Sequence, residues 1–292
     1  MADFQGIIVI HKEKGFTSHD VVAKLRGILH MKKIGHTGTL DPDATGVLPV
    51  ALGKGTKLVD LLTDKEKTYE AVLHLGIDTD TQDMSGTVLE ERPVNVTEEE
   101  VRKVLKSFVG EQLQVPPMYS ALKVNGKKLY ELAREGKTVE RKARPVCFYE
   151  IEPLEFHLPL VKIRVTCSKG TYIRTLCHDI GEKLGCGGCM EELLRSRVGR
   201  YSLFESHTLA QVEAAVADGT VQDMIDRWKQ FWLSTPLFMR ILTGTGFWQM
   251  EIRCPTIWFV PSTKRVGCAC TPVTELLQVF FSGMQGRRNI IR

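Results

Sequence analysis

The chain has 292 residues, of which 43% are hydrophobic and 25% are charged, as in a globular protein with a sizeable core. Its formal net charge of +4 is too small to identify a nucleic-acid-binding protein by itself. No apolar run approaches the roughly 20 residues of a membrane span, and the first residues lack the basic and apolar regions of a signal peptide, so we expect a cytoplasmic protein without membrane contact.

The chain begins with an apolar run of strand length at residues 6–10. A polar turn follows, and Thr17 and Asp20 then have the spacing of a capping box. Apolar residues at helical spacing come next: Val21, Leu25 and Leu29. The sequence therefore predicts a strand, a turn and a helix that ends near residue 30.

Residues 35–46, GHTGTLDPDATG, are typical of a loop, because three glycines, three threonines and a proline oppose a continuous helix or strand. Pro42 favours an extended backbone at Asp41, and the apolar run at residues 47–52 can anchor the loop in a core. A rigid loop that carries one His and one Asp is a common form of functional site. From residue types alone, a turn with a solvated Asp is an equal alternative.

Residues 57–63 are expected to form one or two helical turns, and residues 68–75 have the composition of a strand with Tyr69 near its start. The acidic segment that follows lacks the spacing of an EF-hand, so Asp80 and Asp83 are expected to order the loop by hydrogen bonds and not to bind a metal ion. A second capping signal begins at residue 97 and predicts a helix that Gly110 stops.

Basic residues are concentrated between Lys123 and Arg144, together with a few glutamates. This pattern has two interpretations. A basic helix with flanking loops can follow a phosphate backbone, whereas charge runs are more commonly solvated helix faces.

Residues 160–167 alternate between apolar and polar side chains, which predicts a half-buried strand. A glycine turn then leads into a helix that Gly185 ends. We expect this strand–turn–helix unit to present Tyr172 and Arg174 at a cleft, although packing and a surface ion pair are the alternatives for these two residues.

Eight cysteines are scattered along the chain, which favours reduced thiols over a disulfide framework. Cys186 and Cys189 have the spacing of a metal or redox pair, but two ligands do not close a tetrahedral site. The only candidates for a second pair, Cys254, Cys268 and Cys270, lie in a C-terminal segment of unusual composition. We therefore expect no metal site.

Several of these segments resemble, in order, the motifs of the TruB family, the bacterial tRNA pseudouridine-55 synthases. The resemblance extends from residue 6 to about residue 222 and rests on Lys12-x-x-Gly15-x-x-Ser18, residues 35–46, Lys67-x-Tyr69, residues 79–86, 116–131, 168–175 and 193–199. It implies an α+β pseudouridine-synthase fold, in which a mixed, largely antiparallel sheet with flanking helices surrounds a central catalytic cleft. The catalytic domain would span residues 1–226, with a basic thumb-like insertion at about 119–145.

The resemblance implies that Asp41 is the catalytic carboxylate and that His36 fills the space vacated by a flipped uridine. Tyr69 would stack on the uracil, and Arg174 would orient Asp41 and favour its ionised form. The remaining residues implied for substrate binding complete the uracil pocket: Tyr172 and Leu193. Four lysines are expected to contact the RNA backbone: Lys12, Lys123, Lys127 and Lys128.

The implied reaction converts uridine in the T-loop of tRNA to pseudouridine, and it needs no cofactor because it involves no redox change and no phosphate donor. Two other functions stay open, namely a non-catalytic tRNA-binding or tRNA-folding protein and a guide-dependent pseudouridylase of the dyskerin type. The basic insertion favours recognition of the tRNA T-arm without guide RNA. The oligomeric state is not readable from the sequence, and a monomer is the working expectation.

Residues 227–292 depart from the family pattern, which usually ends in a small β-rich RNA-binding module of the PUA type. This tail holds all four tryptophans and has nine basic but only two acidic residues. It is either a divergent RNA-binding extension with stacking aromatic residues or the product of a reading-frame shift. We favour the frameshift, because clear periodic patterning is missing as well as the expected motif. An in-frame codon pattern up to the stop codon would exclude it.

Overall fold

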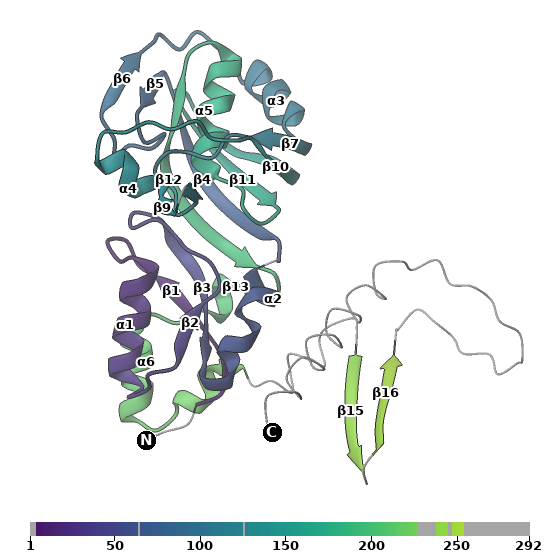
Figure 1. Ribbon diagram of the computed structural model, residues 1–292. Coiled ribbons are helices and arrows are strands. Elements are labelled where there is room, and N and C mark those ends of the chain that lie inside the picture. Colours follow the sequence, from purple (N-terminus) through teal and green to yellow (C-terminus); the bar gives the residue numbers. More distant parts are fainter. Residues whose placement is uncertain (1–3, 64, 125, 227–237, 245–246, 254–292) are drawn as a thin grey trace, which may run out of the picture. The chain divides into compact units, whose positions relative to one another are not determined.

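The computed structural model describes residues 4–63, 65–124, 126–226, 238–244 and 247–253 (Figure 1). The chain divides into two units, Met1–Ser234 and Thr235–Arg292. In the second unit, the described residues form an antiparallel hairpin of β15 (Phe238–Gly244) and β16 (Phe247–Arg253). Most of residues 227–292, to which the prediction of a divergent or frameshifted tail applies, lie outside the described residues.

The first unit is built on a mixed sheet of ten strands, in which the pairing of β3 with β12 is parallel and the other pairings are antiparallel. Eight strands follow the order β14-β1-β3-β12-β4-β11-β10-β7, while β2 pairs with β3 and β13 pairs with β12. The strands are β1 (Gly6–Lys12), β2 (Ile34–His36), β3 (Thr45–Leu52), β4 (Lys67–Leu75), β7 (Gly110–Gln114), β10 (Arg144–His157), β11 (Leu160–Cys167), β12 (Gly188–Val198), β13 (Tyr201–Ser202) and β14 (Ile225–Asp226).

Four of the helices form two pairs that each bury an apolar core against the sheet (Figure 1), and α2 adds Leu62 to a smaller third core. One core joins β1 and β3 to α1 and α6, and the other joins β4, β10 and β11 to α3 and α5. The α-helices are α1 (Ser18–Ile28), α2 (Val59–Thr63), α3 (Glu98–Ser107), α4 (Leu129–Arg134), α5 (Ile173–Leu184) and α6 (Leu209–Ala217). Within the described ranges, none of the helices is both long and apolar enough to cross a membrane.

Short elements complete the first unit. Two small antiparallel pairs lie outside the large sheet, β5 (Ile77–Thr79) with β6 (Val88–Glu91) and β8 (Lys123–Val124) with β9 (Lys127–Lys128). The 3-10 helices are η1 (Gly53–Leu58), η2 (Leu203–Glu205) and η3 (Val221–Met224). The α+β fold and the mixed, largely antiparallel sheet expected from the sequence are thus confirmed.

The local signals in the sequence agree with the observed elements. The capping boxes of α1 and α3 are both complete, so the side chain of each N-cap threonine binds the backbone three residues on. Gly185 ends α5 in the left-handed conformation, with φ at 78°. Along β11 the side chains alternate strictly between buried and half-buried, as its pattern predicts.

The prediction of a loop for the whole of residues 35–46 is wrong at both ends. Gly35 and His36 belong to β2, where His36 pairs with Val50, and Thr45 already belongs to β3. The physical reason is that the buried strand at residues 45–52 offers a free edge, and backbone pairing with it outweighs the weak strand propensity of glycine. The irregular chain that remains is short and held at both ends, which positions Asp41.

Gly46 marks the closest approach of β3 to β12. Its φ is +109°, and a Cβ atom added there would lie 2.2 Å from the carbonyl oxygen of Arg195. We expect Gly46→Ala to destabilise the fold by about 3–5 kcal/mol, because backbone strain and overpacking each cost about 1–3 kcal/mol. Urea unfolding measures this loss.

Gly15→Ala is the matched control, since Gly15 also has a positive φ, +86°, but no atom lies within 4 Å of the added methyl group. It isolates the backbone strain and should cost about 1–2 kcal/mol. Equal losses for the two variants would contradict the steric explanation.

Candidate active site

A cleft of about 1110 Å³ on the first unit is lined by predicted site residues. Its walls come from the loop around Asp41, the turn at residues 80–87, the segment around Tyr119 and the start of α5. Five of the predicted site residues line it together: Asp41, Tyr69, Tyr172, Arg174 and Leu193. Segments that are far apart in the sequence therefore meet at one site.

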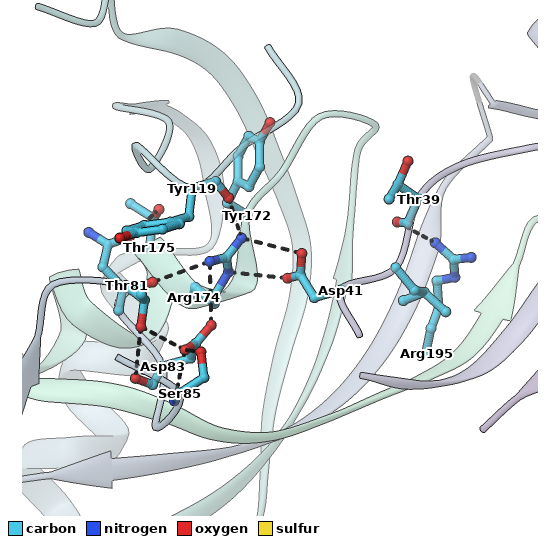
Figure 2. Close-up of polar contacts among 12 residues, drawn as sticks. Thr39, Asp41, Thr81, Asp83, Ser85, Tyr119, Tyr172, Arg174, Thr175 and Arg195 are labelled. Carbon is cyan, nitrogen blue, oxygen red and sulfur yellow. Dashed lines mark hydrogen bonds and ion pairs between the residues drawn. The ribbon is translucent and has the colours of Figure 1, made fainter. Parts of the chain in front are cut away.

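Asp41 and Arg174 face each other in this cleft and make a two-point contact (Figure 2). The Arg174 Nε lies 3.2 Å from Asp41 Oδ2, and Nη2 donates to Oδ1 at 3.4 Å. Arg174 is the second residue of α5. The side-chain amide of Gln114 holds the backbone of the N-cap residue Tyr172, since its Nε2 donates to the Tyr172 carbonyl and its Oε1 accepts from the Tyr172 N–H. The guanidinium therefore stands on a fixed helix end and orients the carboxylate.

Arg174 is saturated by further partners, and its side chain is only 7% exposed. Its Nη1 donates to the Thr81 carbonyl and to the Asp83 carboxylate, both at 3.3 Å, and its Nη2 donates to the Tyr119 carbonyl at 2.8 Å (Figure 2). Asp83 in turn accepts hydrogen bonds from the Thr81 hydroxyl and the Ser85 amide. Asp83 thus orders its loop by hydrogen bonds, as expected, and also ties that loop to Arg174, which the sequence did not indicate.

Burial raises the pKa of Asp41, and this effect outweighs Arg174, whose positive charge lowers it. Asp83 adds a smaller contribution in the raising direction. Arg174 by itself does favour the ionised form of Asp41, as the sequence-based prediction says. The net change in the pKa of Asp41 is nevertheless upward, because burial has the larger effect. The carboxylate remains 42% exposed to the cleft, so a substrate can reach it.

Tyr69 lies on β4 directly opposite Arg195 of β12. The phenol is 8% exposed, and burial raises its pKa to about 12, so it is neutral at pH 7. A hydrogen bond to the Arg195 side chain opposes that shift. Sequence reasoning placed Arg195 in a family motif but did not identify it as a site residue, because an arginine in a strand is usually exposed.

His36 is not among the residues that line the cleft. It ends β2, its Nδ1 accepts a hydrogen bond from the Gly38 amide at 3.3 Å, and its ring meets the edge of His19, which does line the cleft, with centroids 5.3 Å apart. Burial lowers the pKa of His36, which keeps the imidazole neutral with its proton on Nε2.

The prediction that Lys12 contacts the RNA backbone is wrong, because its side chain is completely buried. The ammonium donates to three carbonyls, those of Glu13 at 3.1 Å, Pro42 at 3.0 Å and Ala44 at 2.5 Å. Burial lowers the pKa of Lys12 to about 8. Through these hydrogen bonds Lys12 fixes the backbone of the loop that carries Asp41.

The other three lysines lie on the β8–β9 hairpin. Lys123 and Lys127 are exposed, and Lys127 also pairs with Glu135 at 3.4 Å. Lys128 is half-buried and donates to the Tyr130 hydroxyl at 3.0 Å. These positions leave Lys123 and Lys127 accessible to a phosphate backbone.

Sequence models of two domains match the chain. The N-terminal domain of the TruB family of pseudouridylate synthases matches residues 26–173, and the C-terminal domain of tRNA pseudouridylate synthase B matches residues 174–228. Together they cover residues 26–228, which include Asp41, Tyr69, α5 and the strands of the large sheet from β2 to β14.

Similar proteins with curated names are tRNA pseudouridine synthases B. The chain is 56% identical to that of Lachnoclostridium phytofermentans over 239 residues, which covers 79% of this chain and 78% of the relative. It is 53% identical to that of Alkaliphilus oremlandii, with 72% and 70% coverage, and 49% identical to that of Bacillus subtilis, with 75% and 73% coverage.

Among solved structures, a chain of a Cbf5–Nop10–Gar1 complex has a TM-score of 0.62 and 36% identity, and the match covers 76% of this chain and 60% of the other. A chain of an H/ACA RNP bound to a substrate RNA has a TM-score of 0.59 and 33% identity, with 76% and 59% coverage. This chain therefore spans about 60% of the length of these structural relatives.

Proposed function

The chain belongs to the TruB family of pseudouridylate synthases, and we propose on this basis that it isomerises the uridine at position 55, in the T-loop of tRNA, to pseudouridine. The observation that carries the proposal is the Asp41–Arg174 pair in a cleft of about 1110 Å³. Ligand pockets commonly measure about 300–1,000 Å³, so the cleft has room for a base with its ribose.

The reaction breaks the C1′–N1 bond of uridine, turns the uracil and forms a C1′–C5 bond. C5 loses a proton and N1 gains one, so the product is an isomer and neither an oxidant nor a group donor is consumed. The site must therefore hold the base outside its stack, place an anionic group near the sugar and ring, and provide a path for one proton.

A uridine in folded RNA must first leave its stack, which costs a few kcal/mol. His36 fills the vacated space in this proposal, because its flat neutral ring can stack and its Nε2 proton can donate. Tyr69 and Tyr172 lie in the cleft and provide aromatic faces for the uracil, and Leu193 supplies apolar contact. The neutral Tyr69 hydroxyl takes part in the proton transfer that the isomerisation requires.

Asp41 acts on the sugar or the base in its ionised form. Attack at C1′, attack at C6 and assistance of a glycal route all require a carboxylate, and the same position in the cleft serves each of them. Arg174 keeps both oxygens in a fixed plane, which orients the carboxylate before the substrate arrives.

The thumb-like basic insertion supports recognition of free tRNA without guide RNA, and the tRNA substrate supports action in the cytoplasm. A guide-dependent pseudouridylase and a non-catalytic tRNA-folding protein are the alternatives. Nothing in the cleft favours the second, since the carboxylate, the phenol and the guanidinium all line it.

The test is a pseudouridine assay on unmodified tRNA transcripts without guide RNA, with carbodiimide-stop primer extension to map the product. We expect a single product in the T-loop at position 55, and none in a transcript whose U55 is replaced by cytidine. Product at a different uridine, or product only after guide RNA is added, would contradict the proposal.

Replacing Lys127 and Lys128 with alanine should weaken tRNA binding and flatten its dependence on salt. Each lost phosphate contact reduces the slope of log K against log salt by about 0.7–0.9, so we expect a reduction of about 1–2. The single-turnover rate at saturating tRNA should stay within about twofold, because neither lysine lines the cleft.

The matched control removes the two exposed lysines of α3, Lys103 and Lys106. It changes net charge by the same amount and should leave the slope unchanged. If the two double variants lose affinity equally, the hairpin is no specific RNA contact and only net charge matters.

A further inference from the structure

Arg195 is a buried arginine whose contacts are all with neutral groups. Its side chain is 1% exposed, and burial lowers its pKa. Buried arginines are usually paired with carboxylates, as Arg174 is with Asp41 and Asp83. Across the part of the chain that the structure describes, no carboxylate lies within ion-pair distance of Arg195. Its charge is retained without an ionic partner, which calls for a role other than ion pairing.

The guanidinium joins three parts of the site. Its Nη1 donates to the Thr39 carbonyl at 3.4 Å (Figure 2), its Nε to the Val47 carbonyl at 2.8 Å and its Nη2 to the Gly38 carbonyl at 3.3 Å. Tyr69 lies directly across the β4–β12 pair from Arg195, and the Arg195 side chain interacts with its hydroxyl by a hydrogen bond. Asp41 follows Thr39 by two residues, so one side chain holds both the phenol and the chain that carries the carboxylate.

The direction of the bond between Arg195 and Tyr69 follows from chemistry. A guanidinium has five N–H donors and no acceptor, so the phenol oxygen must accept. The phenol proton is then left to point elsewhere, and Tyr69 and Arg195 both line the cleft. The positive charge also stabilises any negative charge that develops on the Tyr69 oxygen when its proton moves.

We propose that Arg195 is a positioning residue for the isomerisation: it fixes the Tyr69 oxygen as an acceptor and ties it to the loop of Asp41, so that phenol and carboxylate meet one uracil in a fixed relation. This inference rests on the proposed function. It gives a chemical reason for the burial of the Arg195 charge, which is not part of the Asp41–Arg174 pair.

The electrostatics agree with this geometry. Burial raises the pKa of Tyr69 to about 12, and Arg195 provides the largest opposing contribution. Without that charge, transfer of the phenol proton would be harder still. A lysine at position 195 keeps a charge but lacks the planar fork that reaches several acceptors at once.

The test is a double-mutant cycle with Arg195→Lys and Tyr69→Phe, read as the single-turnover rate at saturating tRNA and, separately, as the tRNA dissociation constant. A positioned proton-transfer group contributes about 10²–10⁴-fold, so we expect Arg195→Lys to slow the reaction by about 100-fold while the dissociation constant changes less than about threefold. The loss in the double variant should be clearly smaller than the product of the two single losses, because part of the effect of Arg195 passes through the phenol and the rest through the loop of Asp41.

Arg197→Lys is the matched control on the same strand, since Arg197 is 43% exposed and pairs with Glu66. It should leave the rate unchanged. If Arg195→Lys lowers the melting temperature, the cycle is repeated with Arg195→Gln, which keeps donors for the loop carbonyls but has no charge. Additive losses in the cycle, or a loss confined to tRNA affinity, would overturn the proposal. If the wild-type chain makes no pseudouridine at all, the proposed function fails instead, so the two failures are distinct.

Discussion

Asp41→Asn should abolish pseudouridine formation, with a loss on the order of 10⁴-fold or more in the single-turnover rate, while tRNA still binds. Asparagine has the same shape but no charge, so none of the routes that need an ionised oxygen remains. Its amide NH₂ would also face one of the Arg174 donors that now contact the two carboxylate oxygens. Filter binding and single-turnover product formation measure the two quantities separately.

Asp43→Asn is the control for this variant, because Asp43 lines the same cleft two residues on and is exposed. It should retain most of the activity. Appreciable turnover by Asp41→Asn, in a preparation free of wild-type enzyme, would remove Asp41 from the chemistry and leave the cleft as a binding site.

Arg174→Lys should have the second-largest effect, a loss of about 10²–10³-fold in rate together with a lower melting temperature. A lysine is a point charge on a flexible stem and cannot serve the four acceptors that the guanidinium now satisfies. The shorter list of donors leaves at least one buried acceptor unsatisfied, which costs about 1–3 kcal/mol. Thermal melting and single-turnover assays measure these effects.

The same variant makes a prediction about pH. Burial already raises the pKa of Asp41, so the wild-type rate should fall as the pH falls through a value above that of an ordinary aspartate. The guanidinium opposes that shift, and its less well-placed replacement should move the acid limb to higher pH. An acid limb at the same pH in both proteins would contradict this electrostatic role.

Arg164→Lys serves as the control for the substitution itself. Arg164 lies on β11, is 41% exposed and pairs with Glu70 and Glu152. Exposed ion pairs contribute about 0–1 kcal/mol, so this variant should match the wild type in melting temperature and in pH dependence.

The features that could be predicted from the sequence are those with local causes. The caps of α1 and α3 and the alternation in β11 depend on residues within a few positions of each other, and the structure has all of them. The cleft residues were predicted through motifs, and five of the six expected around the substrate line one cleft, His36 being the exception.

The remaining features have partners that are distant in the sequence. Lys12 is buried because carbonyls about thirty residues on accept its hydrogen bonds, and a lysine in a polar segment gives no sign of this. The three carbonyl partners of Arg195 precede it by 148–157 residues. The raised pKa of Asp41 likewise depends on burial, which exists only once the walls of the cleft are assembled.

The place of β12 in the sheet has a consequence for the newly made chain. β12 lies between β3 and β4, yet β4 ends at Leu75 and β12 begins only at Gly188. On the ribosome, β4 and the start of β3 at Thr45 and Gly46 therefore lack their β12 partner until most of the catalytic domain has been translated, and such non-local pairing is slow to form. Nascent chains released before β12 should carry Asp41 but show no activity and should depend on chaperones to avoid aggregation.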